Sequence, residues 1–230
     1  MNRSFLILLM IGTAMMIAVI GQQQSSHDLN YLPWQIDRLE NGSIRVFGIT
    51  LGKTTVQEAN QIFASFAQTR LQVEHAPDGA ISYRLIARYE KLSFDGLIAE
   101  VQLIYQLDEE SLRALASTPT PKAPASGNTA IDEYAISKEA EMSFLSTPVA
   151  ALIYIPYISY GEEAIRQRFG PPTEEQTVSE NKNLWLYPDF NLQVFIEPKQ
   201  PEKFVYTLEQ QQTGSYEMQT PVEHSGDMSD

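Results

Sequence analysis

The stretch SYGEEAIRQRFGPP (residues 159–172), followed by NLWLY (183–187) and LQVFI (192–196), is the part of the sequence that most directly predicts a fold. The first run has the pattern of a short helix, and the two that follow are rich in the aromatic and β-branched residues that favour strands. A further strand-like run covers residues 203–208. The sequence therefore predicts an α+β protein in which helices pack on an antiparallel sheet.

The predicted helix has recognisable ends. Ser159 and Glu162 have the spacing of a capping box, in which each residue bonds to the backbone of the other. Ile165 and Phe169 recur at helical spacing, and Gly170-Pro171-Pro172 is typical of a helix end. We expect a helix of two to three turns.

The residues before this helix predict two more elements. Residues 130–145 have a helical composition and end before Pro148. Residues 150–159, AALIYIPYIS, are apolar and favour a strand. Pro156 lacks a backbone donor, so it predicts that this strand lies at an edge or is bent.

The first half of the chain predicts several strands. Residues 43–50 form a short extended run after the turn signal Asn41-Gly42. Residues 80–90 and 92–107 read as longer strands, with Asp95-Gly96 as a turn within the second run.

Two helices are predicted among these strands. Thr55 and Glu58 fit a capping box, and apolar residues recur at helical spacing as far as Phe66, which predicts three to four turns. Asp108 is placed to cap a second, short helix over residues 109–116.

These patterns divide the chain into segments. Residues 117–129 contain three prolines together with Ser, Thr, Ala and Gly, as linkers do. The flanking segments share one plan, a capped helix followed by strands, and so predict two similar halves. We expect a membrane anchor or signal peptide at 1–21, a juxtamembrane segment at 22–40, a first half at 41–116, a linker at 117–129, a second half at 130–209 and a disordered acidic tail at 210–230.

The second half resembles the small outer-membrane-assembly lipoproteins of the SmpA/OmlA (BamE) type. In that family a helix ends in a Gly-Pro stop and is followed by a Trp-x-Tyr strand and an apolar strand. The matching positions are Ile165, Phe169, Gly170, Pro172, Trp185, Tyr187, Leu192, Val194 and Phe195. The resemblance implies binding or scaffolding instead of catalysis, and two such units in tandem would resemble the β-lactamase-inhibitor protein, which also acts through a protein interface.

Location is predicted by Phe5–Ile20, sixteen residues without a charge. A membrane-spanning helix needs about 20 apolar residues, and neighbouring Ser4 and Gly21 extend this run. Arg3 precedes the run and no Lys or Arg follows before Arg38, so the head is predicted to be cytoplasmic and the rest periplasmic. The expected location is the inner membrane, in a single pass; the alternative is a soluble periplasmic protein cleaved near Gly21.

Composition limits the classes of partner and chemistry. The chain has a net charge of −13, which disfavours nucleic acid because its binding requires neutralisation of phosphates. The absence of cysteine excludes disulfides, thiol nucleophiles and a lipid-modified cysteine. With 43% hydrophobic residues, the chain can form a packed core.

No catalytic residue, cofactor site or metal site is predicted. The run Gly48–Thr54 imitates a phosphate-binding loop, but three residues instead of four separate its glycines, so no nucleotide is expected. The histidines, at 27, 75 and 224, lack metal-binding spacing. The acid pairs at 108–110, 162–163 and 174–175 are assigned to helix starts and turns.

The remaining candidate is an interface formed by Tyr154, Tyr157 and Tyr160, since tyrosine is enriched at protein interfaces. The alternative is that these tyrosines belong to a core strand. The predicted function is a membrane-tethered periplasmic protein-binding or scaffold protein, not an enzyme, which acts in cell-envelope assembly or maintenance. An exported hydrolase with an acid-based site and a secreted protein inhibitor are the alternatives.

Overall fold

The computed structural model describes residues 31–76, 79–117 and 131–208. The predicted membrane segment at 5–20, the tail at 210–230 and all of the predicted linker except Ser117 lie outside these residues. Within the described residues, no helix has both the length and the apolar character needed to cross a membrane.

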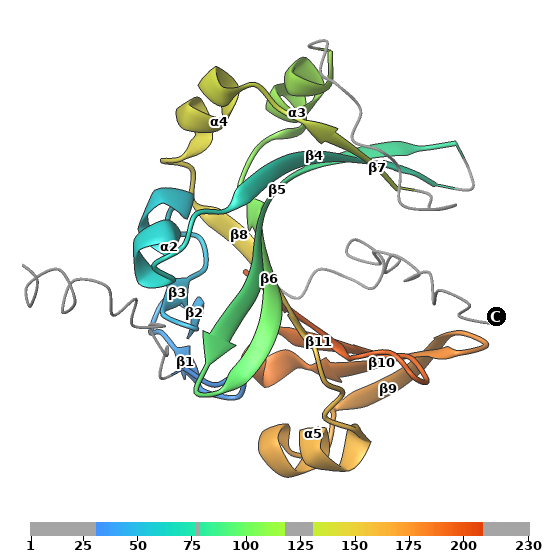
Figure 1. The fold of residues 1–230 in the computed structure, drawn as a ribbon. Coiled ribbons are helices and arrows are strands. Elements are labelled where there is room, and N and C mark those ends of the chain that lie inside the picture. Colours follow the sequence, from blue (N-terminus) through green and yellow to red (C-terminus); the bar gives the residue numbers. More distant parts are fainter. Residues whose placement is uncertain (1–30, 77–78, 118–130, 209–230) are drawn as a thin grey trace, which may run out of the picture.

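The centre of the fold is a nine-stranded sheet in which all neighbours are antiparallel. Its order is β7-β4-β5-β6-β8-β12-β11-β10-β9, and it curves strongly from one edge to the other (Figure 1). The strands are β4 (Gln68–His75), β5 (Ile81–Phe94), β6 (Leu97–Tyr105), β7 (Ile131–Ala135), β8 (Val149–Pro156), β9 (Glu174–Ser179), β10 (Lys182–Tyr187), β11 (Leu192–Ile196) and β12 (Lys203–Thr207).

In the described part of the chain, four helices and a small three-stranded sheet pack against one face of the large sheet, which we call the helix-covered face. The helices are α2 (Val56–Ile62), α3 (Glu109–Ala116), α4 (Lys138–Phe144) and α5 (Glu162–Phe169). The small sheet is formed by β1 (Ile36–Arg38), β2 (Ile44–Val46) and β3 (Ile49–Thr50), and a 3₁₀ turn, Pro188–Phe190, precedes β11. This arrangement confirms the predicted class, helices packed on an antiparallel sheet.

The opposite face has its own cluster of buried side chains, all from strands. Successive side chains of a strand point to opposite faces, so Ile104 lies on this face while its neighbours Leu103 and Tyr105 belong to the other cluster. We call it the strand-only face.

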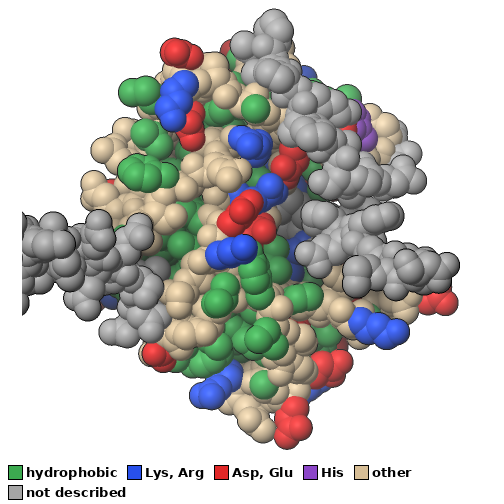
Figure 2. Space-filling model, in the orientation of Figure 1, with side chains coloured by type: hydrophobic (Ala, Val, Ile, Leu, Met, Phe, Trp, Pro, Cys, Tyr) green, Lys and Arg blue, Asp and Glu red, His purple; other side chains and the backbone are tan. Residues whose placement is uncertain are grey.

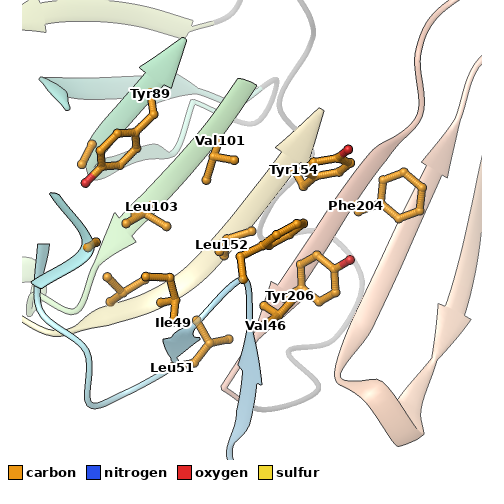
Figure 3. Close-up of a cluster of buried hydrophobic side chains, with 14 of the residues drawn as sticks. Val46, Ile49, Leu51, Tyr89, Val101, Leu103, Leu152, Tyr154, Phe204 and Tyr206 are labelled. Atoms are coloured by element: carbon orange, nitrogen blue, oxygen red, sulfur yellow. The ribbon is translucent and has the colours of Figure 1, made fainter. Parts of the chain in front are cut away.

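The extended run predicted at 43–50 does not form one continuous strand, because it folds back as the hairpin of β2 and β3. Phe47 and Gly48 both have positive φ, 51° and 79°, as a two-residue hairpin turn requires. The turn places the Phe47 ring 4.5 Å from that of Phe94 and 5.0 Å from that of Tyr154. Figure 3 shows part of this core, where labelled side chains of β2, β6, β8 and β12 meet.

The predicted long helix after Thr55 is also wrong in extent. The capping box of Thr55 and Glu58 is confirmed, but α2 ends at Ile62. Ala64 then adopts a positive φ of 47°, and Phe66 is 89% exposed. Strand β4 follows, which the sequence analysis did not predict; its alternating Thr69, Leu71 and Val73 are buried.

Three other predictions of local structure have mixed outcomes. The helix capped by Asp108 and the turn at Asp95-Gly96 are confirmed. The predicted helix over 130–145 divides into strand β7 and helix α4, because residues 131–135 pair along β4 at the edge of the sheet.

Pro156 predicted either an edge strand or a bent one, and the first of these is wrong because β8 is central in the sheet. It pairs with β6 on one side and β12 on the other. Pro156 lies beyond the last residue pair with β12, Phe204 and Tyr154, so its missing N–H removes no hydrogen bond from that ladder. Strands from both sides of the predicted linker thus form one sheet.

The buried turn at Phe47 provides a stability test. Phe47→Ala removes a ring that is 1% exposed and should lower the free energy of unfolding by about 3–5 kcal/mol in urea denaturation. Phe66→Ala, the same change at an exposed ring, should alter it by less than about 0.5 kcal/mol. Equal effects of the two substitutions on the free energy of unfolding would contradict the burial of the Phe47 ring in the core.

Candidate functional site

The three predicted interface tyrosines do not share one surface. Tyr154 is fully buried in β8, so its assignment to an exposed interface is wrong and the core alternative holds for it. Its ring contacts Phe47 and Phe94, and its hydroxyl bonds to that of Tyr160. Burial raises the pKa of Tyr154 far above its ordinary value, so this hydroxyl stays protonated.

Tyr160 is partly buried beside the helix-covered face. Its ring lies 6.3 Å from that of Trp34, edge to face, and 5.9 Å from that of Phe204. Tyr157, by contrast, is 46% exposed, and its backbone N–H donates to the carbonyl of Ile98 at 3.0 Å. The spacing of three residues fails to align these tyrosines because β8 ends at Pro156 and the chain turns between Tyr157 and Tyr160.

The loop between β8 and α5 is held by the buried carboxylate of Glu202. It accepts hydrogen bonds from the hydroxyl of Ser159 at 2.7 Å and from the N–H groups of Tyr160 and Gly161, each at 2.9 Å. The predicted capping box is therefore wrong, because Ser159 bonds to Glu202 and Gly161 begins the helix with φ 77°. Nothing in the local sequence signals this partner, which is 41 to 43 residues away.

Exposed apolar side chains gather where this loop meets the start of β6. Ile98, Tyr157 and Ile158 are 50%, 46% and 79% exposed. Tyr157 bonds to the backbone of Ile98, and Ile158 is the next residue in the chain. We call these three residues the end patch.

A second feature at this end of the sheet is a cavity of about 300 Å³, here called the Trp34 pocket. It lies between the segment before β1 and helix α5, and its lining is mostly apolar. The side chains that form it include Trp34, Leu97, Tyr160, Ile165, Arg168 and Phe169. Trp34 and Arg168 belong to no site predicted from the sequence, yet the guanidinium of Arg168 lies 4.6 Å from the centre of the Trp34 ring.

The strand-only face carries a continuous network of polar side chains centred on Arg88. Its guanidinium donates to both carboxylate oxygens of Glu133, at 2.5 and 3.1 Å, and its Nε lies 3.3 Å from Glu100. The amides of Gln72 and Gln102 donate to the same two carboxylates, at 2.9 and 2.6 Å. Burial opposes ionisation of Glu133, but the hydrogen bonds from Arg88 and Gln72 outweigh it and lower its pKa.

Viewed as in Figure 1, the molecular surface shows charged side chains of both signs over the middle of the sheet, with hydrophobic side chains below them (Figure 2). Ile98, Glu100, Gln102 and Ile104 alternate along β6 and so point to the strand-only face. Polar and apolar side chains therefore share this face.

The other residues weighed for chemistry have structural contacts. Asp108 caps α3, and Glu175 pairs with Arg166 at 2.9 Å. The backbone N–H groups of Gly52 and Thr54 donate to backbone carbonyls of the protein itself. His75 lies 3.6 Å from Asp132, and within the described residues no cluster of three or more His, Asp or Glu could hold a metal.

Comparison with known proteins gives no relative for this chain: no family model, no curated protein and no solved structure matches it.

The lowered pKa of Glu133 predicts a pH-dependent contribution to stability. Because its folded pKa is lower than its unfolded value, that contribution is present above about pH 4.3 and disappears as the pH falls through the folded pKa. Glu133→Gln should lower the free energy of unfolding at pH 7 by about 1–3 kcal/mol, with a smaller deficit below pH 4. Urea denaturation across pH 3–7 measures this, and a deficit that grows on acidification would contradict it.

Loss of the Glu202 carboxylate should loosen the loop before α5. Glu202→Ala leaves three donors without their acceptor and should lower the free energy of unfolding by about 2–4 kcal/mol. Hydrogen exchange at the amides of Tyr160 and Gly161 should accelerate. Glu180→Ala, the same change at an exposed glutamate, is the matched control and should leave both quantities unchanged. Unchanged hydrogen exchange in Glu202→Ala would contradict the role of Glu202 in holding this loop.

Proposed function

We propose that this chain is a membrane-tethered periplasmic protein that binds another protein and acts in cell-envelope assembly or maintenance. Residues 5–20 provide the tether, and Arg3 on the cytoplasmic side sets its orientation. The two similar halves at 41–116 and 130–209 remain part of this proposal.

The observation that carries the proposal is the end patch. Seven large hydrophobic side chains are exposed among the described residues, and three of them, Ile98, Tyr157 and Ile158, lie together. Apolar groups clustered on a surface gain about 25 cal/mol for each Å² that a partner covers. A protein partner that presents an apolar surface of its own fits this patch best.

The order of elements in the second half supports the likeness to the SmpA/OmlA type. Helix α5 ends at Phe169 with Gly170 as its C-cap, and after β9 come strands β10 and β11, which carry the Trp-x-Tyr and apolar runs. Trp185 and Tyr187 are buried there as core residues, so the proposed likeness concerns the fold and not a binding surface formed by these side chains.

Site-specific photo-crosslinking in the native host tests the proposal. The full chain carrying benzoylphenylalanine in place of Ile158 should give a discrete protein adduct in the membrane fraction. Adding Ile98→Asp should abolish that adduct, because a charge in the end patch opposes apolar contact.

The same probe in place of Phe66 is the control, since that side chain is exposed but lies outside the end patch. Absence of an adduct from position 158, or the same adduct from position 66, would refute binding through the end patch.

A further inference from the structure

The Trp34 pocket has the composition of a small-molecule site. Its volume of about 300 Å³ is at the lower end of the range for ligand pockets, so its occupant is small. Ile165 and Phe169 of α5 form one wall, Trp34 another, and Leu97 comes from the start of β6. An apolar ligand body suits this lining.

One charged side chain lines the pocket, Arg168. The preceding arginine on α5, Arg166, gives a direct comparison because each guanidinium lies over a tryptophan ring, Arg166 at 4.0 Å from Trp185 and Arg168 at 4.6 Å from Trp34. Arg166 also pairs with the carboxylate of Glu175 at 2.9 Å. Among the described residues Arg168 forms no ion pair with a carboxylate, and its side chain is exposed, so its donors are available to an external anion.

The glutamates Glu202 and Glu163 bond to other groups and not to Arg168. Glu202 lies behind the loop and already accepts three hydrogen bonds from Ser159, Tyr160 and Gly161. Glu163, in the first turn of α5, accepts from the amide of Gln167 at 3.2 Å. The Glu202 contacts also fix Tyr160, so this part of the pocket wall is rigid before a ligand arrives.

We infer that the Trp34 pocket binds a small apolar carboxylate, with the carboxylate on Arg168 and the apolar body between Trp34 and α5. Guanidinium binds carboxylate through paired, charge-assisted hydrogen bonds, and stacking on Trp34 holds its plane in place. This site goes beyond the proposed function, because none of the end-patch residues lines it. The same chemistry occurs in a free acid and in the apolar C-terminal residue of a polypeptide.

Tryptophan fluorescence of the full chain provides the test, since Trp34 is one of two tryptophans and lines the pocket. Titration with 4-phenylbutyrate should give a saturable change that is lost in Trp34→Phe. Saturation-transfer NMR on the ligand checks binding independently of the fluorophore. The uncharged analogue 4-phenylbutanol should bind at least tenfold more weakly.

Matched variants separate this site from general apolar binding. Arg168→Gln should weaken 4-phenylbutyrate binding at least tenfold, whereas Arg166→Gln, on the same helix, should change it less than twofold. Ala164→Phe should fill the pocket and abolish binding, with circular dichroism confirming the fold. Equal binding of acid and alcohol, an unchanged Arg168→Gln, or no saturable binding by either method would overturn the inference.

A second pair of probes identifies the source of the carboxylate. The peptide acetyl-Gly-Gly-Phe with a free C-terminus is compared with its amide and with 4-phenylbutyrate. Tighter binding of the free-ended peptide supports a polypeptide terminus as the ligand, and tighter binding of 4-phenylbutyrate supports a free acid. Equal binding of the peptide and its amide would contradict carboxylate recognition.

Discussion

The antiparallel pairing of β6 with β8 is the constraint on which the rest of this structure depends. It runs from Ala99 opposite Pro156 to Tyr105 opposite Val149, and it joins strands β4–β6, before the predicted linker, to the strands from β8 onward. Because side chains alternate along each strand, both strands supply both faces: Leu103 and Leu152 pack under the helices, while Ile104 and Ala151 lie on the strand-only face. Without this ladder, each half of the sheet would have an open edge.

The same pairing places both candidate sites. Where β8 ends, Tyr157 stays bonded to Ile98, which creates the exposed end patch. The chain then turns, and Glu202, just before β12, fixes the loop that starts α5. The position of α5 beside Trp34 in turn forms the pocket. Two surfaces with different chemistry thus arise at one end of the sheet.

Local signals in the sequence predicted many of the elements. Capping by Thr55 and Asp108, the turn at Asp95-Gly96 and the end of α5 at Gly170 depend on neighbours within a few residues, and all are confirmed. Two of the failures share a cause: the central position of β8 and the Glu202 contacts depend on partners far away in the chain, which no short window of sequence contains. The hairpin at Phe47 is instead a local two-residue turn that the extended pattern of 43–50 did not reveal.

The sequence by itself determined the α+β class, the positions of most strands and helices, and the absence of thiol chemistry, because composition, periodicity and caps are local properties. Only the tertiary structure decided which tyrosine is core and which is surface, since Tyr154 and Tyr157 differ in burial through sheet pairing and not through residue type. It also decided that Arg166 has a carboxylate partner while Arg168 lines a pocket. Two arginines of equal intrinsic chemistry acquire different roles because the packing of α5 turns one toward Glu175 and the other toward Trp34.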